Sequence, residues 1–561
     1  MSMGRKKRRS DRVAPLDLPP GQMARLFGAL RHREVLVRLA MCLLSILALW
    51  AVTKAWDPPF WYRVGYTPVH DLQSRVAFRC PSLGEADRFL DYPAGAPLVE
   101  AGEPLQPRIV EILRAEQEAF LAQRDPAHRL RRRAYRSVAI LGLFVVLYAM
   151  SGYYLVSRKR RLIDKLRPFT TMLLAVVTTV AMAKWLSVDP WRAELVPLLL
   201  FGMTVSIAYG RELAMLLSAC LALVLAVTVG HSLGDFMLLA GAAAAAILFL
   251  RRIRTRSKLI QVGLFTGLAA FLLTIGSGVL DNQPVARSLL AVAGWNAIWG
   301  VAAGFLISGM LPFIERAFGV LTEISLLELG DVAHPLLQEL VRRAPGTYNH
   351  SINVASMAEA AAERIGASGL LVRVGAYFHD IGKMLKPAYF IENQGPESSR
   401  HESLVPAMST LIIIAHVKDG ADLSRQHHLP QPIIDFIEQH HGTTLVEYFY
   451  HRANEQQQLD PDSGEVEENA YRYPGPKPQT KEAGVLMLAD AVEGAARVLV
   501  EPTPARIENL VHEIAMKRLL DGQFDECGLN LQELRSIEES LAKSLTAVYH
   551  GRVKYPSQRT A

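Results

Sequence analysis

Eight long apolar segments constrain the fold of this chain more than any other feature of its sequence. The first spans residues 35–56, and seven more follow at 136–157, 168–187, 194–209, 212–230, 234–250, 258–279 and 288–313. Because about 20 apolar residues in a helix cross a bilayer, these segments predict membrane-spanning helices. A signal peptide is the alternative for the first segment, but its late start and the absence of a small-residue cleavage site argue against it.

Positive charge is concentrated beside these apolar segments. The formal net charge is +7, with clusters such as GRKKRRS, SRKRRL and RRIRTRSK. Basic loops of membrane proteins stay on the cytoplasmic side, so the N-terminus and everything after residue 314 are expected inside, and residues 57–134 outside. We therefore expect a multi-pass protein of the cell (inner or plasma) membrane, whose basic clusters face the lipid bilayer rather than a nucleic acid polymer.

The alternation of apolar and polar sequence divides the chain into consecutive parts. We expect a mostly α-helical fold: a polytopic bundle of one N-terminal plus seven helices, a small mixed α/β ectodomain and an all-α cytosolic domain. The predicted boundaries are a basic cytoplasmic tail 1–34, a first transmembrane helix 35–56, an ectodomain 57–134, a seven-helix region 135–314, a linker helix 315–344, a cytosolic domain 345–555 and a tail 556–561.

Histidine and aspartate recur beside apolar, helix-like sequence in the cytosolic domain. A lone histidine there predicts only a packed core side chain, but burying many ionisable groups without compensation would be very costly. A shared metal site supplies the compensation, because carboxylates and neutral imidazoles bind cations. The candidate ligands are His350, His379, Asp380, His416, His440, His441 and Asp490.

Seven candidate ligands exceed the four of a tetrahedral zinc site and suit two metal ions. The two oxygens of Asp380 could serve one metal each. Histidine and carboxylate ligands without thiolate fit iron or manganese as well as zinc, and the four cysteines are scattered without a CxxC pair. Two cations about 3.5–4 Å apart can activate water for attack on phosphorus, which indicates phosphoester hydrolysis.

The motifs around these residues resemble a known family. The His-Asp pair with distant histidines is similar to the HD-domain phosphohydrolase superfamily. The stretches HPLLQELVRRAPGTYNHS, GAYFHDIGKMLKPAYFIENQ, IIDFIEQHHGTTLVEYFY and YPGPKPQTKEAGVLMLADAVE resemble the seven-transmembrane HD proteins, the PgpH-type cyclic-di-AMP phosphodiesterases. The resemblance is dense over 330–555, and the one-plus-seven helix layout extends it. It implies an HD phosphodiesterase domain over 345–555 that hydrolyses cyclic di-AMP to linear pApA.

The resemblance also implies how the ligands are shared between two metals, iron or manganese. The first metal would be held by His350, His379, Asp380 and Asp490. Asp380 would bridge to the second metal, which His416, His440 and His441 would also hold.

Neighbouring residues are candidates for direct roles with the substrate. Lys383, one helical turn after His379, could place its ammonium on the substrate phosphate and take part in catalysis with Asp380. The alternative for Lys383 is a solvated surface lysine. The other candidate substrate contacts are Tyr348, Asn349, Lys477, Thr480 and Lys481.

Three other functions stay open beside this interpretation. A receptor that binds a nucleotide without turnover would be favoured by a missing ligand, and none is missing. The second is an HD hydrolase that acts on another cyclic dinucleotide or nucleotide. In HD-GYP domains, which cleave cyclic di-GMP, Gly-Tyr-Pro follows the double histidine. Here GTTLVEYFY follows it instead, which argues against cyclic di-GMP as the substrate. A transporter would need ionisable residues inside the spans, which are scarce.

The ectodomain departs from the family pattern because it is far shorter than is usual. Its ends, VHDLQSRVAF and VEAGEPLQPRIVEIL, resemble the flanks of the family's ectodomain, and the middle is missing. A compact connector and a sensory domain are both compatible with this. The extracytoplasmic ligand, homo-oligomerisation and any further cleavage of pApA remain open from the sequence.

Overall fold

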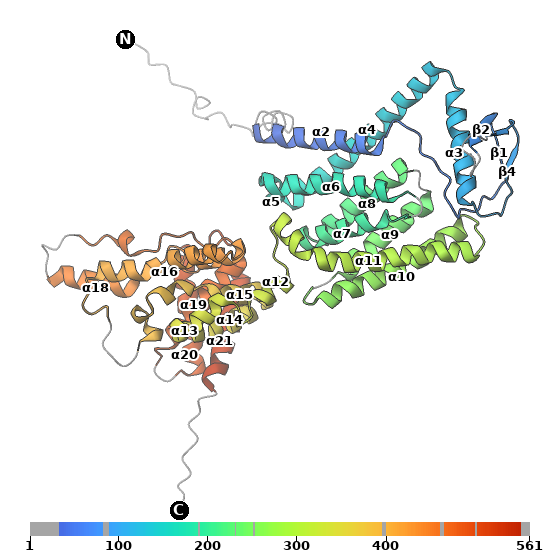
Figure 1. The fold of residues 1–561 in the computed structure, drawn as a ribbon. Coiled ribbons are helices and arrows are strands. Elements are labelled where there is room, and N and C mark those ends of the chain that lie inside the picture. Colours follow the sequence, from blue (N-terminus) through green and yellow to red (C-terminus); the bar gives the residue numbers. More distant parts are fainter. Residues whose placement is uncertain are drawn as a thin grey trace, which may run out of the picture. The chain divides into compact units, whose positions relative to one another are not determined.

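The computed structural model describes residues 33–81, 89–188, 191–229, 232–250, 253–394, 400–459, 465–499 and 502–550. The predicted basic tail 1–34 therefore lies almost entirely, and the tail 556–561 wholly, outside the described residues. The chain forms two compact units, Met1–Val320 and Leu321–Ala561. Figure 1 shows the course of the chain through both units.

Each of the eight predicted apolar segments falls on one helix of the first unit. Six are long and apolar enough to cross a membrane, while α7 and α9 are shorter. Most side chains of α7 are buried among its neighbours, which explains why this helix is apolar all round. The prediction of a multi-pass membrane protein is thus confirmed. The helices are α2 (Arg33–Thr53), α4 (Pro126–Arg158), α6 (Leu166–Leu186), α7 (Leu195–Tyr209), α8 (Arg211–Val229), α9 (Leu233–Phe249), α10 (Arg256–Leu280) and α11 (Arg287–Phe318), with the short α5 (Arg160–Asp164) after α4.

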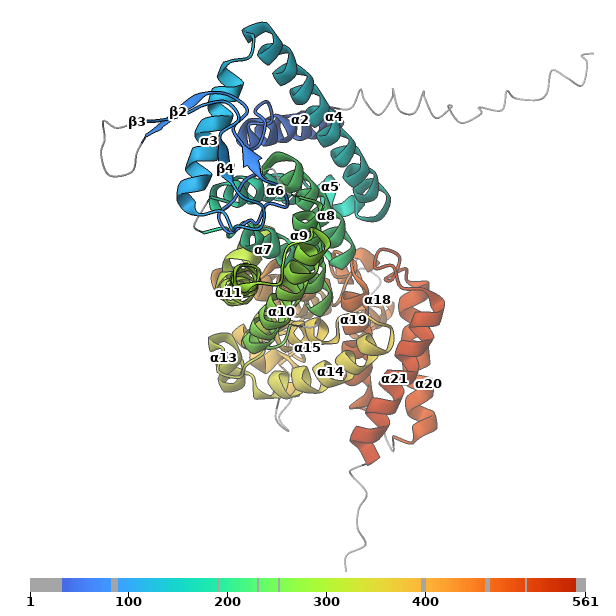
Figure 2. The ribbon, with the colours of Figure 1, turned by 90° about the vertical axis from the view of Figure 1, so that its right-hand side faces the viewer.

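The segment predicted to be the ectodomain forms a small α/β unit, as expected from its sequence (Figure 2). Strand β1 (Leu72–Gln73) pairs with β4 (Pro97–Val99), and β2 (Phe78–Pro81) pairs with β3 (Phe89–Tyr92), both antiparallel. Helix α3 (Pro107–Ala122) contributes Val110 and Leu113 to a small apolar core. Glu116 of the same helix is nearly buried and accepts hydrogen bonds from the backbone N–H (2.9 Å) and the guanidinium (2.6 and 3.0 Å) of Arg75.

The second unit is helical and surrounds one large apolar core, which confirms the mostly α fold. The predicted linker 315–344 divides among the end of α11, α12 and α13, and Leu326, Leu336 and Leu340 belong to that core. The elements are α12 (Glu323–Leu329), α13 (Pro335–Arg343), α14 (Pro345–Arg364), α15 (Gly369–Phe378), the 3₁₀ helices η2 (Ile381–Leu385), η3 (Pro387–Tyr389) and η4 (Ile391–Asn393), α16 (Pro406–Gln426), α17 (Gln431–Gln439), α18 (Glu447–Leu459), η6 (Glu468–Tyr471), α19 (Lys481–Ala496), α20 (Pro504–Leu520) and α21 (Leu531–His550).

Helices α10 and α11 pack backbone against backbone through glycines. A Cβ built on Gly304 would lie 2.6 Å from the Cα of Gly263, and one on Gly300 would lie 2.7 Å from the Cα of Gly267. Small residues permit this close approach between membrane helices, where no hydrophobic effect drives association. The two helices are therefore expected to behave as one rigid pair.

We predict that Gly304→Leu destabilises the membrane unit, because the added side chain must push the helix pair apart at a cost of about 1–3 kcal/mol. The thermal unfolding midpoint of the purified chain in detergent should fall. Gly309→Leu on the same helix is the matched control, since a Cβ there meets nothing within 4 Å. Equal midpoints for the two variants would contradict the packing argument.

Candidate metal centre

The ends of helices in the second unit bring the seven predicted ligands together. His379 directly follows α15 and His440 directly follows α17, each as the C-cap of its helix. His350 comes from the first half of α14, His416 from the middle of α16 and Asp490 from α19. Five helices separated in the sequence thus converge beside η2. All of the seven ligands except His441 and Asp490 are buried.

One glycine explains how Asp380 reaches this position. After His379 the chain turns into η2, and a Cβ on Gly382 would lie only 2.0 Å from the carbonyl oxygen of His416. Any larger residue would push η2 away from α16. Gly382 therefore allows the close contact that places Asp380 beside the imidazole of His416.

Hydrogen bonds fix the orientation of four imidazoles. The Nδ1–H groups of His379, His416 and His440 donate to the carbonyl oxygens three residues earlier, at 2.7, 2.5 and 2.8 Å. In His350 the Nδ1 atom lies 2.5 Å from Glu493 Oε2. With Nδ1 acting as the donor, Nε2 carries the lone pair, which is the arrangement that metal-binding histidines use.

The Nε2 atoms surround Asp380 in two groups. Oδ2 of Asp380 lies 3.2 Å from His379 Nε2 and 3.6 Å from His350 Nε2, and His350 Nε2 is 2.9 Å from Asp490 Oδ1. These four residues form the first cluster.

Oδ1 of Asp380 faces the other way. It lies 3.3 Å from His416 Nε2 and 3.6 Å from His440 Nε2. His441, whose ring stacks on Tyr473 with centroids 4.3 Å apart, completes the second cluster. Within each cluster the potential ligand atoms lie within 4.8 Å of one another. Asp380 therefore offers one oxygen to each cluster.

Burial and charge act against each other at this centre. Burial alone would raise the pKa of the Asp380 carboxyl, but the neighbouring His379 and Lys383 hold it well below its usual range. Burial lowers the pKa of His440 and holds that of His441 well below its ordinary value, so both imidazoles are neutral. A deprotonated carboxylate and neutral imidazoles are the forms that bind a divalent cation.

Lys383 is also part of this centre rather than a solvated surface lysine. Its Nζ lies 2.7 Å from Asp380 Oδ2 and 3.0 Å from Glu392 Oε1, and 13% of its side chain is exposed. Burial alone would lower the pKa of Lys383, but the two carboxylates raise it above its ordinary value. The ammonium is therefore always charged and links η2 to η4.

Sequence analysis did not identify two acidic residues of the surrounding shell. Glu493 accepts from His350 and from the Arg497 guanidinium, and Glu392 accepts from Lys383 and the Thr347 hydroxyl. Burial alone would raise the pKa of Glu493, but the hydrogen bond from His350 lowers it. The spacing could have indicated Glu493, because it follows Asp490 by three residues and therefore shares its helix face.

The candidate substrate contacts have varied surroundings. Tyr348 packs against the apolar core, and Asn349 lines a cavity of about 740 Å³ together with Glu493 and Arg497. The other three make structural contacts: Lys477 Nζ donates to the Gly522 carbonyl (2.9 Å), Thr480 caps the N-terminus of α19, and Lys481 pairs with Glu533.

Two family models match adjacent parts of the chain. The model described as "7TM receptor with intracellular HD hydrolase" matches residues 135–322, and the model described as "HD domain" matches residues 347–495. The resemblance to seven-transmembrane HD-domain proteins is therefore confirmed, and a His/Asp centre compatible with divalent cations lies within the HD match.

The chain is also similar to curated proteins. The chain is 38% identical over 435 residues to "Cyclic-di-AMP phosphodiesterase PgpH" of Bacillus subtilis (strain 168), covering 74% of this chain and 59% of the relative. It is 43% identical over 325 residues to the protein of that name in Listeria monocytogenes, covering 58% and 44%. The chain thus spans about half the length of the curated relatives it matches. A solved HD domain of the Listeria protein in complex with cyclic-di-AMP is 49% identical, covers 39% of this chain and 100% of that chain, and has a TM-score of 0.37.

We predict that Glu493→Gln weakens the affinity for Mn²⁺ by about 10–100-fold, because the outer carboxylate orients His350 and raises its basicity. A competition titration of the purified chain with a fluorescent chelator measures this affinity. Glu513→Gln is the control, an exposed glutamate on α20 in the same unit. Unchanged affinity in Glu493→Gln would show that the hydrogen bond to His350 does not support metal binding.

Proposed function

We propose that this seven-transmembrane HD-domain protein is a membrane-anchored phosphodiesterase that hydrolyses cyclic di-AMP to linear pApA. The observation that carries the proposal is the pair of His/Asp clusters that share Asp380. The curated relatives named as cyclic-di-AMP phosphodiesterases support the choice of substrate. The largely buried centre of charged groups includes Lys383, whose ammonium can bind a phosphate oxygen. These features support phosphodiester hydrolysis as the reaction.

The residues at the centre fit two divalent cations, which we propose to be iron or manganese. Among the described residues, no protein group is within hydrogen-bond geometry of the buried His379 Nε2 or of either carboxylate oxygen of Asp380, although Lys383 forms an ion pair with Oδ2. Buried polar atoms are normally satisfied, so these atoms indicate a ligand. The first ion would be held by His350, His379, Asp380 and Asp490, and the second by Asp380, His416, His440 and His441.

The chain's own groups then prepare the site for a phosphodiester. Two bound cations would supply an activated water and neutralise charge on the phosphate. Lys383 donates one of its three N–H groups to Glu392 and forms an ion pair with Asp380, so an N–H group is available for a phosphate oxygen. The ion pair with Lys383 also keeps Asp380 deprotonated and oriented toward both clusters.

Further substrate contacts are proposed on two segments beside the centre. Tyr348 and Asn349 directly precede His350 on α14. The segment that carries Lys477, Thr480 and Lys481 starts after Tyr473, which stacks on His441, and the Gln479 N–H donates to the side chain of Gln439 (2.9 Å) beside His440. Both segments therefore lie beside residues that we propose to bind metal.

The proposed location is the cell membrane, with the N-terminus and the HD unit in the cytoplasm. The loops that follow α4 and α9 carry SRKRRLIDKLR and RRIRTRSK, whereas the alternate loops carry little positive charge. Cytoplasmic loops of membrane proteins carry an excess of Lys and Arg, so the two basic loops are proposed to be cytoplasmic. Cyclic di-AMP would then meet the site on the cytoplasmic side.

We predict that the purified, Mn²⁺-loaded chain converts cyclic di-AMP to pApA and leaves cyclic di-GMP largely intact, with products identified by chromatography. Asp380→Ala should remove turnover, because it removes the oxygens shared by both clusters. Tight binding of cyclic di-AMP without turnover by the loaded wild type would instead favour a nucleotide receptor.

We predict that Lys383→Met lowers kcat by about 10²–10³-fold while the metal content stays unchanged, because a charged donor to the transferring phosphoryl group is lost. The matched control is Lys386→Met, an exposed lysine three residues later. If both variants kept the wild-type kcat, Lys383 would have only a structural role.

A further inference from the structure

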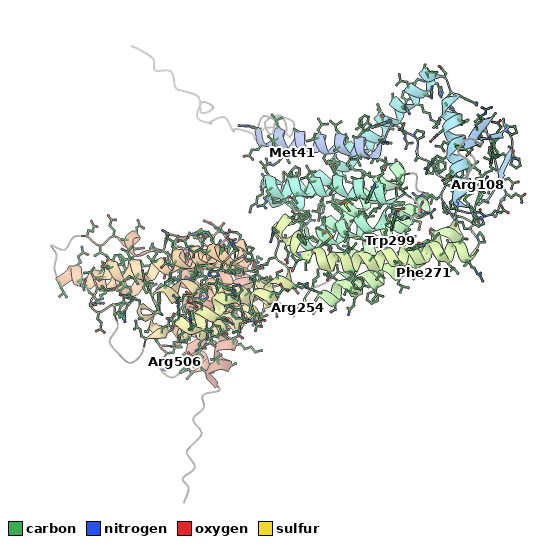
Figure 3. The ribbon with its side chains drawn as sticks, in the orientation of Figure 1. Met41, Arg108, Arg254, Phe271, Trp299 and Arg506 are labelled. Atoms are coloured by element: carbon green, nitrogen blue, oxygen red, sulfur yellow. The ribbon has the colours of Figure 1, made fainter. Side chains whose placement is uncertain are left out.

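A turn directly after α20 reaches the metal centre, although it lies outside the part of the chain that matches the HD family model. That match ends at residue 495. Arg506, labelled in Figure 3, lies in the first turn of α20, and the other end of the helix leads into Asp521, Gly522 and Gln523. The side chain of Gln523 is fully buried. A buried amide needs a partner for each of its polar groups, so its partners show what it holds.

Gln523 holds a single residue of the loop that follows the double histidine. Its Oε1 accepts from the Thr443 N–H at 3.0 Å, and its Nε2 donates to the Thr443 hydroxyl at 2.9 Å. The same Nε2 donates to Asp521 Oδ2 at 2.9 Å. Both N–H groups and the oxygen of the amide are therefore used, and Thr443 is fixed through its backbone and its side chain together.

Arg472 completes this set of hydrogen bonds. Its guanidinium donates to the Thr443 carbonyl at 2.8 Å and to Asp521 Oδ2 at 3.2 Å, and it lies 3.1 Å from Asp521 Oδ1. The N–H, the carbonyl and the hydroxyl of Thr443 are thus all bound. We call Arg472, Asp521 and Gln523 the Thr443 clamp. Satisfied polar networks of this kind hold one defined geometry.

Gly442 shows how closely the clamp approaches the loop. This glycine lies between His441 and Thr443 and has a φ of 53°, which glycine adopts without strain. A Cβ built on it would lie 2.4 Å from Gln523 Oε1. The backbone that leaves His441 therefore packs directly on the clamp.

His441 depends on its surroundings more than the other four histidines do, because each of those uses Nδ1 in a hydrogen bond. Within the described part of the chain His441 makes none: its Nδ1 is 3.9 Å from Asp490 Oδ2, and its ring stacks on Tyr473. Tyr473 directly follows Arg472, and its N–H donates to the Thr444 carbonyl at 3.0 Å. The clamp thus lies beside both supports of this imidazole, the loop backbone and the stacked ring.

We propose that the Thr443 clamp positions His441 and thereby sets the affinity of the second cluster for its metal ion. This inference rests on the proposed two-metal centre. Asp380, His416 and His440 do not depend on the clamp, so its loss would weaken binding of the second ion rather than abolish it. The first cluster would be unaffected. The segment after the HD match then belongs to the metal centre, although it supplies no ligand.

The test measures metal binding by the full chain in detergent, without any nucleotide. The electron paramagnetic resonance signal of aqueous Mn²⁺ counts free ions during a titration and gives the dissociation constant of each step. His441→Ala identifies the step that belongs to the second cluster. Gln523→Met removes the amide at similar length and should raise that constant about tenfold, while the other stays within about twofold. Gln532→Met, an exposed glutamine on α21, should change neither constant.

A second pair of variants tests the clamp from its other side. Thr443→Val removes the hydroxyl that accepts from Gln523 and should raise the same constant about threefold, because one hydrogen bond is lost. Thr443→Ser keeps the hydroxyl and should behave as the wild type. Unfolding midpoints verify that each variant folds, and the Thr443 pair decides the matter if Gln523→Met does not.

The outcomes separate this inference from the proposed function. Two ions in the wild type, with both constants unchanged in Gln523→Met and Thr443→Val, would overturn the role of the clamp alone. Equal weakening of both steps would also overturn it, since it would show a general loss of structure. A single ion in the wild type would contradict the two-metal centre itself, and the inference with it.

Discussion

A deprotonated carboxylate can be buried only where positive charge compensates for its lost hydration, and Asp380 is such a carboxylate. Its two oxygens face different imidazole clusters, and the ammonium of Lys383 forms an ion pair with one of these oxygens, Oδ2. Removing any one cluster would leave the carboxylate without part of that compensation. The geometry of the second unit therefore surrounds Asp380 with the Lys383 ammonium and with imidazole nitrogens.

Helix ends provide the means to do so. His379 and His440 lie at helix C-caps, and each donates to a carbonyl of the last turn that has no partner further along the helix. The hydrogen bond satisfies the carbonyl and turns Nε2 toward the centre. Gly382 then permits η2 to approach α16 closely enough for Asp380 to meet His416. Local backbone chemistry thus determines where the ligands point.

Much of this arrangement could be predicted from the sequence, because its physical causes are local. The apolar segments predicted most of the eight helices within a few residues, although α4 begins ten residues before its segment, at Pro126. The seven His/Asp candidates stood out because buried ionisable groups need a common partner. The roles of Glu493 and Glu392 could not be predicted in the same way. Their function depends on contacts with His350 and Lys383 that only the tertiary fold creates.

The same limit applies to the membrane unit. One cavity of this unit is lined by Arg63 and Asp281, which are about 220 residues apart in the chain. The sequence around each residue, taken alone, predicts only an ordinary polar loop or helix end. Likewise, Leu336 of the predicted linker belongs to the apolar core of the second unit. The amphipathic pattern of the linker predicted a helix but did not reveal what that helix packs against.

The most direct test of the two-cluster centre is the number of metal ions that the purified chain binds. Inductively coupled plasma mass spectrometry on protein prepared with Mn²⁺ should find two ions per chain in the wild type. His441→Ala, which alters the second cluster alone, should retain one, and Asp380→Ala should retain fewer than one. A single ion in the wild type that is unaffected by His441→Ala would contradict the account.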